Sequence, residues 1–454
     1  MKTDSSRQIG IIGGGFAGLT AALRLAQAGH RVTVWEKGRF GGQAATFEVA
    51  DTRLEVFYHH LFQSDTSIAA LAEELGVGDD LQWHPSNVGY FADGKIYPLN
   101  GAVDLLKLGC IPFHDRIRVG LVTAYLQRVK SWKKYENVTA HAWLERALGK
   151  RAYDKTLGAQ LRAKFGSYYD QVAMVWFWGK IWLRTTSRRS PLDQEKLGYF
   201  RGSFQTIVDA LVAGCENAGV DLRRAGISEL SQNSDERWSV TTEGGIEDEQ
   251  FDTIIATVPS NIFQRMVPDL PADYQKKLSV LEYEAAVVAI LELDRPLTDI
   301  YWLNVADDDL PFTGIIEHTN FIDPSLYGGR RFVYLSKYME PDHPYFTMES
   351  DEIIKTYLPY LKRVNPQFED TWVKNSWVFR ERAAQPIIPL HYSSMIPDHR
   401  TPMKNLYLAN TTQIYPEDRG TNYSVRLGND IAKIVLEDSN ASKSQRKAES
   451  TLIP

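Results

Sequence analysis

An apolar run near the start of the chain leads through glycines into a second apolar segment. Ile9, Ile11 and Ile12 predict a buried strand, and residues 16–28 carry apolar side chains at helical spacing. Residues 31–35 predict the next strand. The order strand, glycine-rich turn, helix, strand is typical of a parallel α/β sheet.

Two later stretches of the chain show a related mixture of patterns. Residues 197–259 predict, in order, a helix at 206–218, strands at 220–222 and about Ile227, a hairpin at 238–242 and a strand at 253–257. Residues 405–437 predict a strand at 406–408 and a helix at 423–436, with Asn422 as its N-cap. These stretches are expected to return to the sheet that the N-terminus begins.

The glycines after the first strand have the spacing of a dinucleotide-binding turn. Gly13 permits a tight turn, Gly15 allows the backbone to approach a pyrophosphate, and Gly18 allows helix and strand to pack closely. Ala17 lies in the same helical turn, whose N-terminus favours phosphate charge. Glu36 ends the second strand, where its carboxylate is expected to bind a ribose hydroxyl.

The continuation Glu36-Lys37-Gly38-Arg39-Phe40-Gly41-Gly42 resembles the motif E-x-x-x-R-x-G-G, with the arginine one residue early. That motif belongs to the flavin superfamily of amine oxidases, protoporphyrinogen oxidases, phytoene and carotene desaturases, and UDP-galactopyranose mutases. The resemblance implies an FAD site that includes Lys37 and Arg39, with Gly41 and Gly42 beside the ribityl chain and flavin. It further implies that Ile227 contacts the adenosine, and that the final helix points its N-terminus, with Gly420, Thr421 and Asn422, at the flavin pyrimidine ring.

The expected fold class is therefore α/β, with two interleaved domains. A Rossmann-type FAD-binding domain would comprise residues 8–60, 197–259 and 403–438, and an α+β substrate domain residues 61–196 and 260–402. Residues 439–454 are expected to form a flexible tail.

Two adjacent histidines are the candidate catalytic residues. His59 and His60 follow a predicted hairpin at 46–57, and the corresponding region of amine oxidases passes beside the flavin. An imidazole there is able to move a proton near neutral pH. The alternative is that both histidines are structural, and no metal site is expected.

The segment 172–184 contains three tryptophans within seven positions. We expect a mostly buried helix, one or two faces of which line the substrate cavity. Trp178 is a candidate wall residue, and Arg184, Arg188 and Arg189 are candidates for holding a carboxylate or phosphate.

Residues 103–136 hold seven basic and three acidic residues, a local charge of +4. They include a predicted helix at 115–132. This basic, partly apolar stretch predicts either peripheral contact with a membrane, cover for an anionic substrate, or an ordinary solvated helix over the core.

Composition narrows the function classes. With 51 basic and 57 acidic residues among 454, the net charge of −6 gives no signature of nucleic-acid binding. Cys110 and Cys215 form neither a disulfide framework nor a metal cluster, the N-terminus is polar, and no apolar run approaches a membrane span. The expected location is the cytoplasm, with membrane association possible through 103–136. No prediction of oligomeric state follows from these patterns.

These observations together predict an FAD-dependent oxidoreductase that removes a hydride from a C–H (or C–N) bond of a small molecule to flavin N5. Monoamine oxidases of the superfamily that the motif resembles tether flavin through a cysteine near the end of the chain. No cysteine follows Cys215 here, so the resemblance implies non-covalent FAD. The strand 285–293 lacks the lysine that many amine oxidases place against the flavin, which favours oxidation of a carbon skeleton. A redox-neutral mutase and a flavin-free lipid escort like the Rab GDP-dissociation inhibitors are the alternatives.

Overall fold

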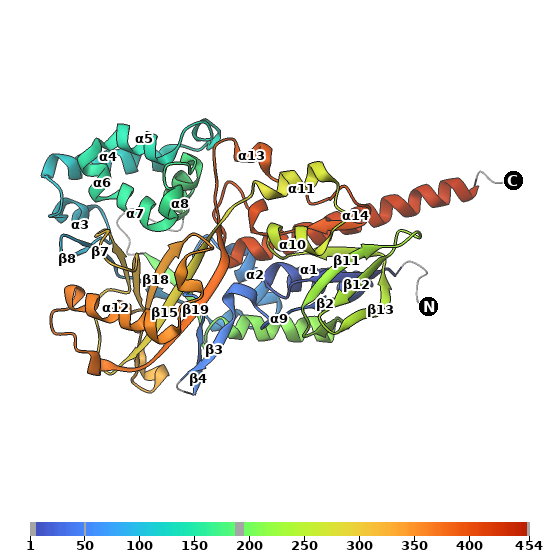
Figure 1. Cartoon of the computed structure of the whole chain (residues 1–454), viewed down its shortest axis with the longest axis horizontal. Coiled ribbons are helices and arrows are strands. Elements are labelled where there is room, and N and C mark those ends of the chain that lie inside the picture. Colours follow the sequence, from blue (N-terminus) through green and yellow to red (C-terminus); the bar gives the residue numbers. More distant parts are fainter. Residues whose placement is uncertain (1–5, 50, 187–194, 452–454) are drawn as a thin grey trace.

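A five-stranded parallel sheet forms the centre of one lobe of the molecule (Figure 1). The structure is a computed structural model, and it describes residues 6–49, 51–186 and 195–451. The sheet order is β10 (Asp221–Arg223), β2 (Arg31–Trp35), β1 (Gln8–Ile12), β14 (Thr253–Ala256) and β20 (Leu406–Leu408). Its strands come from three separate stretches of sequence, and the predicted α/β class is confirmed.

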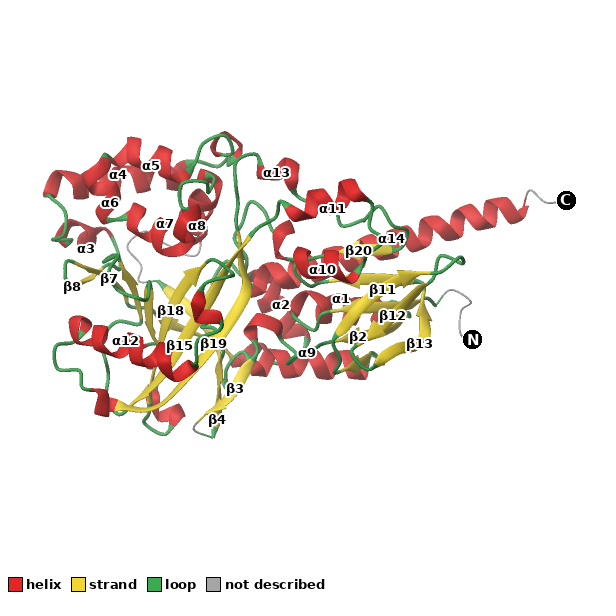
Figure 2. Ribbon diagram, in the orientation of Figure 1, coloured by secondary structure: helices red, strands yellow, loops and turns green. Residues whose placement is uncertain are grey.

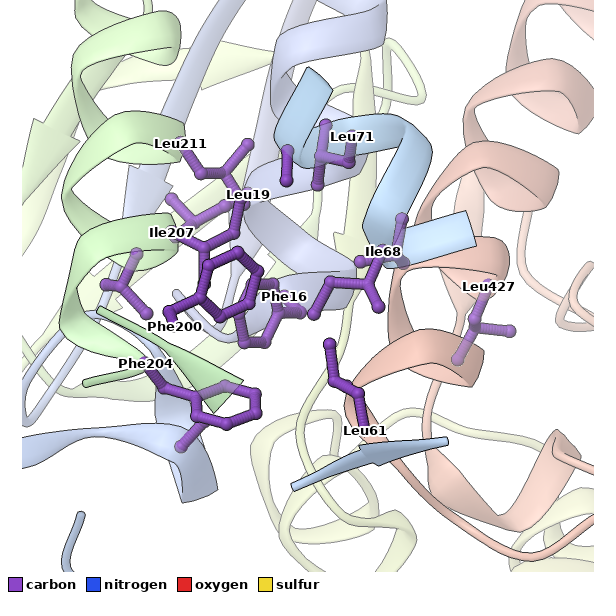
Figure 3. Packing of buried hydrophobic residues seen from close by; sticks show 14 of the residues in the cluster. Phe16, Leu19, Leu61, Ile68, Leu71, Phe200, Phe204, Ile207, Leu211 and Leu427 are labelled. Atoms are coloured by element: carbon purple, nitrogen blue, oxygen red, sulfur yellow. The ribbon is translucent and has the colours of Figure 1, made fainter. Parts of the chain in front are cut away.

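Helices from distant parts of the chain pack against one another beside this sheet. They are α1 (Phe16–Gln27), α2 (Thr66–Glu74), α9 (Gln205–Asn217) and α14 (Thr421–Thr451). Figure 3 shows Phe16 and Leu19 of α1 close to Ile207 of α9, with Ile68 of α2 beside them, and Leu427 of α14 belongs to the same cluster. Each buried side chain of this size stabilises the fold by about 1.5–3 kcal/mol, so this cluster holds the N-terminal and C-terminal segments together.

Three small antiparallel sheets accompany the parallel one. The first consists of β11 (Ile227–Gln232), β12 (Trp238–Thr242) and β13 (Gly245–Phe251), the second of β3 (Thr46–Val49) and β4 (Thr52–Glu55), and the third of β5 (Leu61–Phe62), β9 (Lys196–Phe200) and β6 (Leu81–Pro85). The first sheet packs against the parallel sheet, where the ring centroids of Phe251 and Trp35 are 5.1 Å apart.

The other lobe is built on a seven-stranded mixed sheet. Every residue of β15 (Tyr283–Leu293), the second strand from one edge, is buried, because both faces of the sheet are covered there. Val287 and Leu291 pack in one cluster with Tyr357 of α12 (Ser350–Val364), which lies across the sheet (Figure 2), whereas Val288 faces the opposite cluster. The sheet order is β19 (Val373–Pro386), β15 (Tyr283–Leu293), β18 (Arg331–Met339), β17 (Gly314–Glu317), β16 (Trp302–Val305), β7 (Val88–Ala92) and β8 (Lys95–Pro98).

A group of helices stands above this sheet (Figure 1). It comprises α3 (Ala102–Lys107), α4 (Phe113–Arg128), α5 (Ala140–Leu148), α6 (Lys150–Lys155), α7 (Leu157–Phe165) and α8 (Met174–Thr186). The helix predicted at 115–132 is therefore found, but it ends at Arg128, because Val129 is extended. The short helices α10 (Ser260–Met266), α11 (Ala272–Ser279) and α13 (Tyr392–Met395) lie toward the first lobe.

The C-terminal helix differs from its prediction at both ends. α14 begins at Thr421, so Asn422 lies inside the helix, and it continues to Thr451 through most of the expected flexible tail. Its far end projects beyond the lobe in Figure 1. Among the residues that the structure describes, no helix is both long and apolar enough to cross a bilayer.

Candidate functional site

The first glycine turn leaves an open, uncapped helix N-terminus. Gly13 has a φ of +113°, and a Cβ at Gly18 would lie 1.9 Å from the Gly13 carbonyl oxygen. A Cβ at Gly15 would meet only the Gly42 Cα, at 3.8 Å, so space remains on that side. α1 has no side-chain cap and no acidic residue in its first turn, which contains Ala17. Its free N–H groups suit a pyrophosphate.

The second glycine pair lies directly against the first turn. Gly41 N–H donates to the Gly14 carbonyl at 2.9 Å, and Gly15 and Gly41 form an isolated parallel bridge. Gly41 and Gly42 have φ values of +103° and +59°, which favour glycine. The two motifs, Gly13 to Gly18 and Gly41-Gly42, form one surface with few side chains, which we call the glycine floor. Such a surface fits the diphosphate and ribityl parts of FAD.

The acidic residue at the end of β2 faces the same turn. Glu36 accepts hydrogen bonds from Gly14 N at 2.8 Å and from Gly38 N at 2.6 Å. Lys37 instead forms an exposed ion pair with Glu243 at 2.5 Å. The Arg39 guanidinium donates to the Thr46 carbonyl, so its visible role is to hold the start of β3.

The other predicted FAD residues lie on separate elements. Ile227 is the partly buried first residue of β11, and Gly420, Thr421 and Asn422 line a cavity at the start of α14. The N-cap prediction for Asn422 is wrong. Its side-chain oxygen accepts from Ser67 N at 2.8 Å and Ile68 N at 3.2 Å, and so caps α2.

The cavity has a volume of about 480 Å³ and is lined by residues of both lobes. Gln43, which follows Gly42, lies on one side of it. Apolar walls come from α8, from β15 and from strands of the same sheet, and they include Trp176, Phe177, Ile181, Val288 and Trp302. The arrangement accommodates a flat ring system and an organic molecule beside it.

Both candidate catalytic histidines line this cavity. His59 donates from Nδ1 to the Phe57 carbonyl at 2.6 Å, and His60 Nδ1 lies 3.0 Å from the Tyr301 hydroxyl oxygen. Burial lowers the pKa of His59 to about 4 and that of His60 to about 3. At neutral pH both imidazoles are therefore uncharged.

The aromatic helix is mostly buried, as predicted, but a different part of it faces the cavity. Trp176 and Phe177 line the cavity, together with Arg184. Trp178 is turned away from it: its indole N–H donates to the Val129 carbonyl at 2.9 Å, and its ring stacks on Trp182. The prediction for Trp178 as a wall of this cavity is wrong. Arg188 and Arg189 lie outside the described residues.

The cavity also contains a polar cluster that the sequence patterns did not predict. Tyr338 of β18 accepts a hydrogen bond from Arg419 Nη2 at 3.2 Å, and Lys164 Nζ of α7 lies 3.5 Å from the centroid of its ring. Asp418 pairs with Lys180 of α8. All five residues line the cavity. The available signals were the alternation along β18, which directs Ser336 and Tyr338 to one side, and the Asp418-Arg419 pair just before the final helix. No pattern pointed to Lys164.

Comparisons with known proteins agree with this geometry. The family model described as flavin-containing amine oxidoreductase matches residues 16–416. The chain is 26% identical over 175 residues to the Mycobacterium tuberculosis protein named "Putative flavin-containing monoamine oxidase AofH", which is 36% of this chain and 38% of that one. It is 24% identical over 320 residues to the tomato (Solanum lycopersicum) 15-cis-phytoene desaturase, or 65% of this chain and 54% of the relative.

The chain thus spans about two fifths to one half of the length of these two relatives. A crystal structure of reduced UDP-galactopyranose mutase shares the fold, with a TM-score of 0.73 at 16% identity, over 95% of this chain and 96% of the other. The family match covers most of the chain and includes parts of both lobes. The chain belongs to the flavin-containing amine oxidoreductase family.

Proposed function

We propose that the chain binds FAD and catalyses the removal of a hydride from a C–H bond of a small organic molecule held in the cavity. The observation that carries this proposal is the meeting of the two glycine segments in one floor, next to which Gln43, the residue after Gly42, lines the cavity. Bound FAD supplies a two-electron acceptor. The protein's contribution is to orient both molecules and to exclude water.

Each part of the floor has a distinct role in holding the cofactor. The uncapped start of α1 at Gly15 would face the pyrophosphate, and the Glu36 carboxylate would exchange its Gly14 contact for a ribose hydroxyl. The start of α14 at Thr421 would place its positive end toward the flavin pyrimidine ring.

A non-covalent cofactor is supported by the positions of the two cysteines. The Cys215 thiol is buried and contacts the Leu19 carbonyl at 3.3 Å. Cys110 lies between α3 and α4. Neither residue lines the cavity, so no thiol is placed to tether the flavin there.

Oxidation of carbon rather than of an amine remains the favoured chemistry. Ala286 and Val288 are the β15 residues that face the cavity, and neither offers an ammonium group. His59 and His60, uncharged at neutral pH, are our candidates to accept the substrate proton.

The test is anaerobic mixing of the purified yellow protein with candidate substrates. A net oxidoreductase bleaches its flavin without added reductant, and His59→Ala or His60→Ala should slow the bleaching by about 10²–10⁴-fold if that residue takes the proton. Normal rates in both variants would make the histidines structural. Turnover only after dithionite pre-reduction would instead favour the mutase chemistry of the structural neighbour.

The proposal also assigns a membrane-binding role to the exposed surface of α3 and α4. Phe113, Ile117, Leu121 and Tyr125 recur every four residues along α4 and are exposed, as are Val103 and Leu106 of α3. Of the eight large hydrophobic residues exposed in the described chain, these six share one surface, within the stretch of charge +4. We assign this α3–α4 surface to an anionic bilayer, because basic and apolar residues together match lipid headgroups and acyl chains.

A further inference from the structure

Two cations meet at one tyrosine side chain inside the cavity. Lys164 comes from α7 and Arg419 from the segment before α14, and both contact Tyr338. Within the described residues, neither cation forms an ion pair of 4.0 Å or less with a carboxylate. Asp418 interacts electrostatically with both cations but is paired with Lys180, so three cations share this one carboxylate.

The cluster has more hydrogen-bond donors than acceptors. Arg419 Nε is buried and has no hydrogen-bond partner in the described structure. Cations inside a protein without a counter-charge are unfavourable by several kcal/mol, so such groups are normally paired. The arrangement is therefore incomplete as it stands and requires negative charge.

The pKa values of the cluster reflect the same shortage of negative charge. Although burial raises the pKa of Tyr338, Lys164 and Arg419 lower it to about 7. Burial lowers the pKa of Lys164 to about 8. The other charged or titratable groups around the pair come from four segments of the chain, and they are Tyr58, His59, Lys180, Glu284 and Asp418.

We propose that Lys164 and Arg419 bind an oxyanion group of the substrate, a carboxylate or a phosphate, with the Tyr338 hydroxyl as a third donor. This deepens the proposed function, on which it rests, by naming the substrate class: an apolar molecule that carries one oxyanion. The apolar body lies against Trp176 and Phe177, while the oxyanion supplies the charge that the cluster lacks.

The proposal has a specific consequence for protons. With the cavity empty, Tyr338 is largely ionised at pH 8, because its pKa is about 7. An incoming oxyanion repels the phenolate, which then takes up a proton and becomes a donor. At pH 6 the hydroxyl is already protonated, so binding there takes up none.

Calorimetry on the flavin-loaded protein tests this with two probes, inorganic phosphate and propionate. We expect saturable binding of at least one of them, with proton uptake and loss of near-ultraviolet tyrosinate absorption at pH 8 but not at pH 6. Lys164→Gln should weaken binding about tenfold or more. Tyr338→Phe should abolish the change in tyrosinate absorption and reduce the proton uptake, and the uptake that remains comes from Lys164, whose pKa is about 8.

Lys337→Gln is the matched control, since Lys337 is the neighbouring residue of β18 and does not line the cavity. Binding of phosphate alone or of propionate alone supports the proposal and identifies the oxyanion. No saturable binding of either probe, or equal affinity in wild type and a folded, yellow Lys164→Gln, would overturn it. The measurement involves no turnover, so its failure is separate from failure of the redox test.

Discussion

At the scale of single residues, Glu36 and Lys37 provide a test of the nucleotide end of the site. They are adjacent, but Glu36 turns toward the glycine floor and Lys37 toward Glu243 at the surface. Glu36→Ala removes a charge-assisted acceptor, so FAD should bind about 10- to 100-fold more weakly. Lys37→Ala should leave the affinity within about twofold, since exposed ion pairs contribute little. Titration of the apoproteins with FAD measures both, and equal affinities in the two variants would place the ribose elsewhere.

At the scale of elements, Asn422 joins two helices through its side chain. Asn422→Ala deprives the first turn of α2 of its acceptor and should lower the free energy of unfolding by about 0.5–2 kcal/mol. Asn422→Asp keeps an acceptor oxygen at the same place and should retain most of the stability. Urea unfolding of the three proteins compares them. A loss as large in the aspartate variant as in the alanine variant would contradict the capping role.

Local patterns were sufficient to predict several of the elements, but they did not show which face of each element lies toward the cavity. The glycine turn, β2, β15 and the aromatic helix could all be read from nearby residues, because turns and apolar periodicity are local properties. The rotation of α8 about its axis is set by its neighbours in the folded protein, which the local sequence does not reveal. For this reason the sequence favours Trp178 as a wall of the cavity, whereas Trp176 and Phe177 line it. Asparagine is a favoured N-cap residue, but the helix that Asn422 caps is α2, which is distant in sequence.

The polar cluster shows the same limit more sharply. Lys164, Tyr338 and Arg419 are brought together from a helix, a strand and a loop that are each more than 80 positions from the next. Their combination depends on how the two parts of the chain pack. β15 contains no lysine, yet two lysines reach the cavity from elsewhere, Lys164 from α7 and Lys180 from α8.

At the scale of the whole molecule, the α3–α4 surface predicts binding to vesicles of phosphatidylcholine and phosphatidylserine. The double variant Phe113→Ser/Leu121→Ser removes two side chains that are 58% and 67% exposed. Its affinity for the vesicles, measured by co-sedimentation, should fall at least about tenfold. The reason is that each substitution removes about 1.5–3 kcal/mol of favourable free energy from apolar burial. Salt should weaken the wild type as well.

Leu326→Ser is the matched control, because Leu326 is also 58% exposed but lies outside this surface. Its binding to the vesicles should equal that of the wild type. Equal losses in the control and the double variant, or no sedimentation of the wild type, would contradict the assignment. A change in oligomeric state on gel filtration, without a change in sedimentation, would show that the surface binds a second copy of the chain.

The central claim is that the two glycine segments form the FAD site, and Gly15→Val tests it most directly. The folded protein has room for a side chain there, since an added Cβ meets only the Gly42 Cα at 3.8 Å, but the side chain would occupy the place of the pyrophosphate. We predict that the wild type releases about one FAD per chain on acid or heat denaturation, and that Gly15→Val folds with unchanged circular dichroism but releases none. A folded Gly15→Val with stoichiometric FAD, or colour that stays with the denatured wild-type chain, would contradict the account.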